Sequence, residues 1–135
     1  MADPEIDKKP LILVVDDDEL FQRSVCCVLQ HVGLETVTVT DGAHTLDVAA
    51  TRHPDLILLD VDIPGCDGRE VLGQLKRDER TTGIRVFMNS ARDTHEERWV
   101  AFELGAADYF GKPFPVQVLA QRILSRLKPP AHVAE

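Results

Sequence analysis

The sequence contains no apolar segment long enough to cross a lipid bilayer. Its longest fully aliphatic runs are residues 11–15 and 56–59, whereas a membrane-spanning helix needs about 20 predominantly apolar residues. The first residues, from Met1 to Lys9, are charged and lack the apolar core of a signal peptide. We therefore predict a cytoplasmic protein with no membrane segment.

Positive charge and cysteine are also scarce. With 15 Lys and Arg against 23 Asp and Glu, the formal net charge is −8, which argues against direct nucleic-acid binding because such surfaces are basic. The three cysteines, Cys26, Cys27 and Cys66, are odd in number and show no C-x-x-C spacing. They are expected to be reduced thiols, and neither a disulfide framework nor a cysteine metal site is predicted.

The sequence does contain a regular alternation of short aliphatic or β-branched runs with stretches of helical periodicity. Strands are predicted at residues 11–15, 35–39, 55–59, 85–88 and 108–110. Helices are predicted at 19–32, at 43–52, up to about 76, from 94 to a stop at 105, and from 114 to 127. This alternation is typical of a doubly wound parallel sheet with helices on both faces. The length fits one domain, assigned to residues 9–129 between an N-terminal arm (1–8) and a C-terminal tail or linker start (130–135).

Polar residues follow four of the five predicted strands. They are Asp16 and Asp17 after the first strand, Asp60 and Asp62 after the third, Asn89 and Ser90 after the fourth, and Lys112 after the fifth. Ligands of open α/β sheets bind at the carboxyl ends of the strands, so these side chains are expected to converge. Each alone is an ordinary turn or helix-cap residue, and only their joint occurrence at successive strand ends indicates a site.

The residue types in this set suit phosphoryl transfer. Clustered carboxylates repel one another unless a cation neutralises them, and Mg²⁺ prefers oxygen ligands. One carboxylate can act as the nucleophile and form an aspartyl phosphate. A metal ion and a lysine then supply the positioning and charge neutralisation that phosphoryl transfer requires.

These motifs make the chain similar to bacterial response-regulator receiver domains over roughly residues 9–129. The matching stretches are ILVVDD at 12–17, PDLILLD at 54–60, IPGCDG at 63–68, NSA at 89–91 and GAADYFGKPF at 105–114. The resemblance implies a flavodoxin-like fold, with a five-stranded parallel sheet of order 2-1-3-4-5 between two layers formed by five helices. It implies a phosphoacceptor switch of two-component signalling rather than a classical enzyme.

The resemblance also implies a role for each acidic residue. Asp60 matches the phosphoacceptor and is also expected to contact the metal, and Asp17 matches the direct Mg²⁺ ligand. Asp16 matches the acid that holds the metal mainly through water. Asp62 stands at the position that supplies a backbone carbonyl to the metal. Together with Arg92, Asp62 also flanks the route by which water attacks the phosphoryl group, so the two are expected to pair and to tune hydrolysis.

The switch residues are assigned in the same way. Ser90, at a position where threonine is commoner, matches the hydroxyl that moves toward the phosphoryl group, and Lys112 matches the lysine that pairs with a phosphoryl oxygen. The bond from Lys112 to Pro113 is typically cis in the family. Tyr109 matches the aromatic residue that turns inward on phosphorylation. Asn89 replaces the usual apolar residue, so the fourth strand is expected to end early.

The resemblance implies two kinds of partner. A histidine kinase or a histidine phosphotransfer protein supplies the phosphoryl group. An output partner, a missing output domain or a second copy of the chain then meets the face formed by the fourth helix, fifth strand and fifth helix. On the fourth helix, Val100 is expected to point outward, whereas Trp99 and Phe102 are expected to pack inward.

Three alternative interpretations of the sequence compete with this resemblance. Residues 60–64 (DVDIP) resemble the DxDx(T/V) signature of haloacid dehalogenase-like phosphatases, but that motif follows the first strand of its fold and Pro64 replaces its Thr or Val. The segment from Gly105 to Lys112 is one residue too long for a nucleotide-binding P-loop, and Pro113 replaces its Ser or Thr. A scaffold that binds partners without phosphorylation is the non-catalytic alternative.

Overall fold

The computed structural model describes residues 8–127, so the arm predicted for residues 1–8 lies outside it except for Lys8, and the tail at 130–135 lies outside it entirely. Five parallel strands form one sheet in the order β2-β1-β3-β4-β5. They are β1 (Leu11–Val15), β2 (Glu35–Val39), β3 (Leu56–Asp60), β4 (Arg85–Ser90) and β5 (Asp108–Gly111). The predicted fold class and strand order are confirmed.

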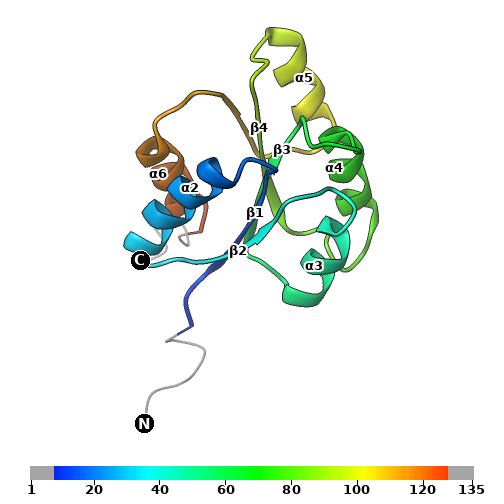
Figure 1. The fold of residues 1–135 in the computed structure, drawn as a ribbon. Helices are drawn as coiled ribbons and strands as arrows, with labels where there is room; N and C mark the ends of the chain where they lie inside the picture. Colours follow the sequence, from blue (N-terminus) through cyan, green and yellow to red (C-terminus); the bar gives the residue numbers. More distant parts are fainter. Residues whose placement is uncertain (1–7, 128–135) are drawn as a thin grey trace, which may run out of the picture.

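Five helices alternate with the strands and cover both faces of the sheet. They are α2 (Glu19–His31), α3 (Thr45–Arg52), α4 (Gly68–Arg77), α5 (His95–Glu103) and α6 (Val116–Leu127). Figure 1 shows α2 and α6 side by side on one face and α3, α4 and α5 on the other. None of the helices in the described part is both long and apolar enough to span a membrane.

The core has two halves because side chains alternate between the faces of each strand. Under α2 and α6 lie Ile12, Val14, Leu56, Leu58, Phe87 and Phe110. Under the opposite helices lie Leu13, Val15, Ile57, Leu59, Val86, Met88 and Tyr109. β1, β3 and the middle of β4 are therefore apolar toward both faces, as is usual for the central strands of a parallel sheet between two helical layers.

The ends of two strands differ from the prediction. β4 continues through Asn89 and Ser90, so the expectation that it ends early was wrong. Asn89 pairs in register with Asp60 on one side and with Phe110 on the other, and this pairing on both edges outweighs the low strand preference of asparagine. β3 runs one residue further than predicted, which makes Asp60 its last residue.

The prediction that Trp99 and Phe102 pack inward was also wrong. Their exposed fractions are 65% and 45%, and Val100 is partly exposed. The side of α5 that faces the sheet carries Ala101, which is buried, and Arg98, which lies over the ring of Tyr109. Spacing of three residues identifies a stripe on a helix, but not which stripe meets the sheet.

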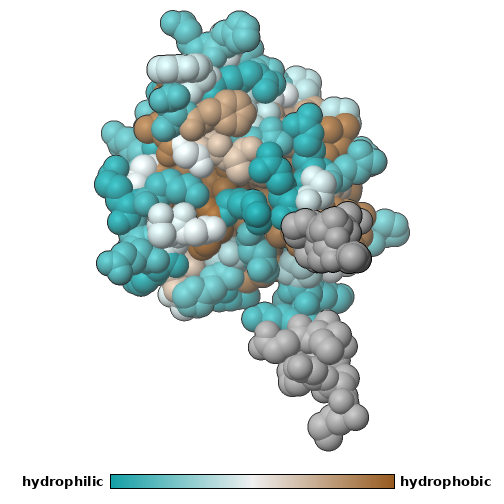
Figure 2. Space-filling model, turned by 180° about the vertical axis from the view of Figure 1, so that it is seen from behind, coloured by the Kyte–Doolittle hydropathy of each residue, from teal (hydrophilic) through white to brown (hydrophobic). Residues whose placement is uncertain are grey.

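Figure 2 shows a mainly hydrophilic surface in which hydrophobic residues occupy smaller areas.

Candidate functional site

Three carboxylates meet at the carboxyl ends of β1 and β3, which are neighbours in the sheet. Each of Asp16, Asp17 and Asp60 offers an oxygen, and these oxygens lie within 4.8 Å of one another. Asp16 and Asp60 are buried and Asp17 is exposed, so the cluster opens to solvent on one side. Close carboxylate oxygens with access to water suit a hard divalent cation that keeps several water ligands. The triad is therefore able to hold a metal ion.

Burial raises the pKa of Asp60, and the neighbouring charges of Asp16 and Asp62 act in the same direction. Two contacts oppose this rise: the backbone N–H of Asp62 donates to Asp60 Oδ1 at 3.0 Å, and the charge of Lys112 favours the carboxylate. Asp60 is thus a partly desolvated carboxylate with two nearby donors. A cation bound to the triad would favour its ionised form further.

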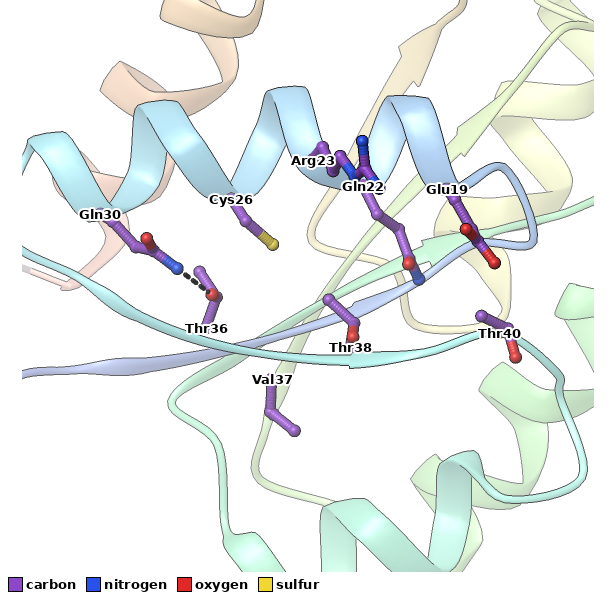
Figure 3. Close-up of a pocket in the computed structure, with 9 residues that line it drawn as sticks. All are labelled: Glu19, Gln22, Arg23, Cys26, Gln30, Thr36, Val37, Thr38 and Thr40. Atoms are coloured by element: carbon purple, nitrogen blue, oxygen red, sulfur yellow. Dashed lines mark hydrogen bonds between the residues drawn. The ribbon is translucent and has the colours of Figure 1, made fainter.

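Asp16 is positioned through its backbone as well as its side chain. The buried side-chain amide of Gln22, on α2, donates to the carbonyl oxygens of Asp16 at 2.8 Å and of Val39 at 3.0 Å. Figure 3 shows the Gln22 side chain reaching from α2 toward the strands. Asp18, two residues after Asp16, caps α2 by accepting from the backbone N–H of Leu20. Sequence reasoning missed Gln22, because a single glutamine in an amphipathic helix carries no signal of such a role.

Lys112 follows the edge strand β5, and its side chain contacts the carboxylates at the ends of β1 and β3. Its Nζ lies 2.9 Å from Asp16 Oδ2 and 3.5 Å from Asp60 Oδ2, and 4.4 Å from the centroid of the Phe21 ring. Burial disfavours the ammonium, but the hydrogen bond to Asp16 and the charges of Asp60 and Asp16 outweigh it, so the pKa of Lys112 is raised. Lys112 stays protonated, and the cis bond to Pro113 implied by the resemblance is present.

Ser90, Asp62 and Arg92 form a connected group beside the Asp60 carboxylate. Ser90 Oγ donates to Asp62 Oδ2 at 3.1 Å and accepts from the backbone N–H of Arg92 at 3.0 Å. Arg92 Nη2 lies 2.6 Å from Asp62 Oδ1, and both side chains are about half exposed. The expected ion pair is therefore present, and the Ser90 hydroxyl is held by Asp62.

The glycine at the start of α4 lets that helix pack against the end of β3. A Cβ atom on Gly68 would lie 2.7 Å from the Cα of Val61 and even closer to the backbone oxygen of Asp60. The N–H of Gly68 donates to the carbonyl of Val61 at 2.9 Å. The backbone of Asp60 and Val61 is thus packed closely against Gly68, with no room for a side chain at that position.

Tyr109 is buried in this structure, with its hydroxyl donating to the carbonyl of Arg92 at 2.6 Å. The guanidinium of Arg98 lies 5.4 Å from the ring centroid, and Arg98 is itself paired with Asp93. Burial raises the pKa of Tyr109. The ring already occupies the inward position that the resemblance associates with the phosphorylated state.

A groove lies elsewhere, between α2 and β2 (Figure 3). It encloses about 650 Å³, and Cys26 Sγ points into it from α2. Thr36, on the strand side, accepts a hydrogen bond from Gln30 at 2.8 Å. None of the clustered carboxylates lines this groove. We therefore take the carboxylate cluster, and not this groove, as the candidate functional site, because the cluster carries the charged groups that can hold a metal ion. Cys26, Cys27 and Cys66 form no disulfide in the structure.

Comparisons with known proteins agree with this geometry. The family model described as "Response regulator receiver domain" matches residues 12–124. The chain is 36% identical over 119 residues to the "DNA-binding dual master transcriptional regulator RpaA" of a Synechocystis species, covering 88% of this chain and 49% of that protein. It is 38% identical over 123 residues to the "Phosphate regulon transcriptional regulatory protein PhoB" of Escherichia coli, covering 89% and 54%. The chain thus spans about half the length of these relatives.

Two solved structures give the same result. A putative response regulator from Chloroflexus aurantiacus superposes with a TM-score of 0.82 at 30% identity, covering 87% of this chain and 97% of that one. The BeF3-activated N-terminal receiver domain of Klebsiella pneumoniae RstA superposes with a TM-score of 0.81 at 27% identity, covering 88% and 99%. Members of this family are generally not classical enzymes, and they use Mg²⁺. With the carboxylate triad in place at its strand ends, the chain belongs to the response-regulator receiver domain family of two-component systems.

Proposed function

We propose that this chain is a phosphorylation-dependent signalling switch that accepts a phosphoryl group on Asp60 with the help of Mg²⁺. One observation carries the proposal: the Asp60 carboxylate is buried at the end of β3, within 4.8 Å of the oxygens of Asp16 and Asp17, and 3.5 Å from the Lys112 ammonium. A nucleophile, a cation site and a fixed positive charge therefore meet at one point. This set meets the requirements of in-line phosphoryl transfer.

The residues divide the work as follows. An Asp60 oxygen attacks phosphorus and forms the acyl phosphate, while the bond from phosphorus to the donor breaks and its electron pair leaves with the donor. Lys112 neutralises charge on the transferred group, and Ser90 leaves Asp62 to donate to a phosphoryl oxygen. Asp16, Asp17 and Asp60, together with the Asp62 carbonyl, would hold Mg²⁺, which supplies further charge neutralisation when bound.

The partners follow from the family. A histidine kinase or a histidine phosphotransfer protein supplies the phosphoryl group. The exposed Trp99 and Phe102 on α5 give the face of α5, β5 and α6 an apolar surface for an output partner, for an output domain of a longer protein, or for a second copy of the chain. With a net charge of −8, this domain is not expected to contact nucleic acid itself, and we expect it to act in the cytoplasm.

The test is covalent labelling with acetyl phosphate and Mg²⁺, followed by mass spectrometry of the intact protein. The wild-type chain should gain one phosphoryl group that hydroxylamine removes, and Asp60→Asn should gain none. Asp47→Asn, which removes an exposed aspartate on α3, is the matched control and should label normally. Full labelling of Asp60→Asn would contradict the assignment of the acceptor. A lack of labelling in the wild type would favour a scaffold that binds partners without phosphorylation. Continued hydrolysis of excess acetyl phosphate would favour a phosphatase.

A further inference from the structure

β4 carries a buried side-chain amide, that of Asn89, which has no hydrogen-bond partner among the described residues. Asn89 has no exposed surface, and neither its Nδ2 nor its Oδ1 has a hydrogen-bond partner among the described residues. Buried amides usually have partners, and an unpaired one opposes folding. Its neighbours in β4, Phe87 and Met88, are apolar. Asn89 therefore weakens the folded state, and such local conflicts are characteristic of functional positions.

Asn89 lies on the same face of the sheet as the acceptor carboxylate. It pairs in register with Asp60 on β3 and with Phe110 on β5. Phe87 and Phe110 belong to the half of the core under α2 and α6, and alternation along the strand directs Asn89 toward that half as well. Adjacent strands are about 4.8 Å apart. The amide is thus an immediate neighbour of Asp60.

The side chain of Lys112 must cross the strand that carries Asn89. Lys112 follows β5, its Nζ reaches Asp60 on β3 and Asp16 after β1, and β4 separates β5 from β3. The contact of Nζ with the Phe21 ring places this crossing on the α2 side, which is the side that Asn89 faces. An ammonium group has three N–H donors, of which Asp16 and Asp60 engage two.

We propose that Asn89 is a positioning residue of the phosphorylation site, whose Oδ1 accepts a hydrogen bond from the Lys112 ammonium when Asp60 is phosphorylated. The inference deepens the proposed function and rests on it. With Asp60 free, the ammonium lies closer to Asp16, at 2.9 Å, than to Asp60, at 3.5 Å. Phosphoryl oxygens on Asp60 draw it from Asp16 toward β3 and β4, where its third N–H meets the Asn89 amide. A contact made only in the phosphorylated state shifts the equilibrium toward that state.

The test uses BeF₃⁻, which mimics the aspartyl phosphate, with the wild-type chain, Asn89→Leu and Asn89→Ala. Fluorine NMR titrations measure BeF₃⁻ affinity, and urea denaturation without BeF₃⁻ measures stability. Asn89→Leu should be more stable than the wild type because it removes a buried unpaired amide, yet it should bind BeF₃⁻ about tenfold more weakly. Asn89→Ala should also bind more weakly, although its cavity lowers stability. Opposite changes in stability and affinity are not expected from a purely structural residue.

Met88→Leu, a buried substitution in the same strand that faces the opposite half of the core, is the control for repacking. It should bind BeF₃⁻ as the wild type does. At saturating BeF₃⁻ the NMR shift of the Lys112 ammonium should match the wild-type shift in Met88→Leu and should be smaller in Asn89→Leu, which lacks the acceptor oxygen. Wild-type affinity in both Asn89 variants would overturn the inference, as would an equal loss in Met88→Leu. A wild-type chain that binds no BeF₃⁻ at Asp60 would contradict the proposed function itself.

Discussion

Replacing Arg92 with alanine is expected to shorten the lifetime of the phosphoryl group on Asp60. Arg92 Nη2 lies 2.6 Å from Asp62 Oδ1, and the backbone N–H of Asp62 donates to Asp60 Oδ1 at 3.0 Å, so the ion pair closes directly beside the acceptor. Water that hydrolyses the acyl phosphate must approach phosphorus in line with the bond that breaks. We expect the closed pair to obstruct that approach.

The structure sets the size of the effect. Both side chains are about half exposed, and exposed ion pairs of this kind contribute only about 0–1 kcal/mol. If the pair must open before water attacks, it adds at most about that amount to the barrier, and about 1 kcal/mol corresponds to a fivefold change in rate. Arg92→Ala should therefore speed hydrolysis by about two- to fivefold, while the free energy of unfolding changes by less than about 1 kcal/mol.

The assay is release of inorganic phosphate from labelled protein at saturating Mg²⁺, after acetyl phosphate has been removed. Asp62→Asn should also speed release, and the double variant should resemble the single variants because either change removes the pair. Arg80→Ala breaks a pair with Asp78 at the C-terminal end of α4 and should leave the rate unchanged. An unchanged rate in Arg92→Ala, or additive effects in the double variant, would refute the gating role.

Three further results are expected. Burial raises the pKa of Asp60 in the folded protein, so ionisation of Asp60 lowers the free energy of unfolding as the pH rises. In urea denaturation, Asp60→Asn should therefore raise the free energy of unfolding at neutral pH but much less in acid. Saturating Mg²⁺ should narrow the difference between variant and wild type, because the metal stabilises mainly the wild type. Gly68→Ala should destabilise the chain by about 2–3 kcal/mol in the same assay, because the new Cβ would meet the backbone of β3 and the acceptor loop. Arg98→Ala should loosen the ring of the single tyrosine, Tyr109, which NMR would detect as faster ring flipping, without loss of labelling at Asp60.

The strands and the acidic cluster could be predicted because their causes are local or topological. Aliphatic runs specify buried parallel strands, and the strand order brings the residues after β1 and β3 to the same edge. The roles of Asp16, Asp17 and Asp60 came from the family resemblance, and the geometry agrees with a shared metal site. The pairing of Arg92 with Asp62 could be predicted for the same reason, because the two residues follow the ends of the neighbouring strands β4 and β3.

The features that could not be predicted depend on tertiary packing. The extension of β4 through Asn89 results from pairing on both edges, which single-residue preference does not report. The exposure of Trp99 results from the way α5 lies on the sheet through Ala101 and Arg98. The inward rotamer of Tyr109 depends on contacts with Arg98 and with the carbonyl of Arg92.

These packing contacts connect the acceptor site to the surface of α5. The Tyr109 hydroxyl is bonded to the Arg92 carbonyl, the Arg92 side chain to Asp62, and Asp62 to the Ser90 hydroxyl. If the Ser90 hydroxyl moves to a phosphoryl oxygen, it gives up its hydrogen bond to Asp62. The Asp62 carboxylate then keeps its contact with the Arg92 side chain but loses its contact with Ser90. Because Tyr109 is already inward, we expect phosphorylation to change the contacts that hold the ring rather than the position of the ring. Under the proposed function, a charge change at Asp60 would then bias the α5 surface through this short chain of hydrogen bonds. Arg92 stands in both parts of this chain, so its substitution should alter the lifetime of the phosphoryl group and the response of α5 together.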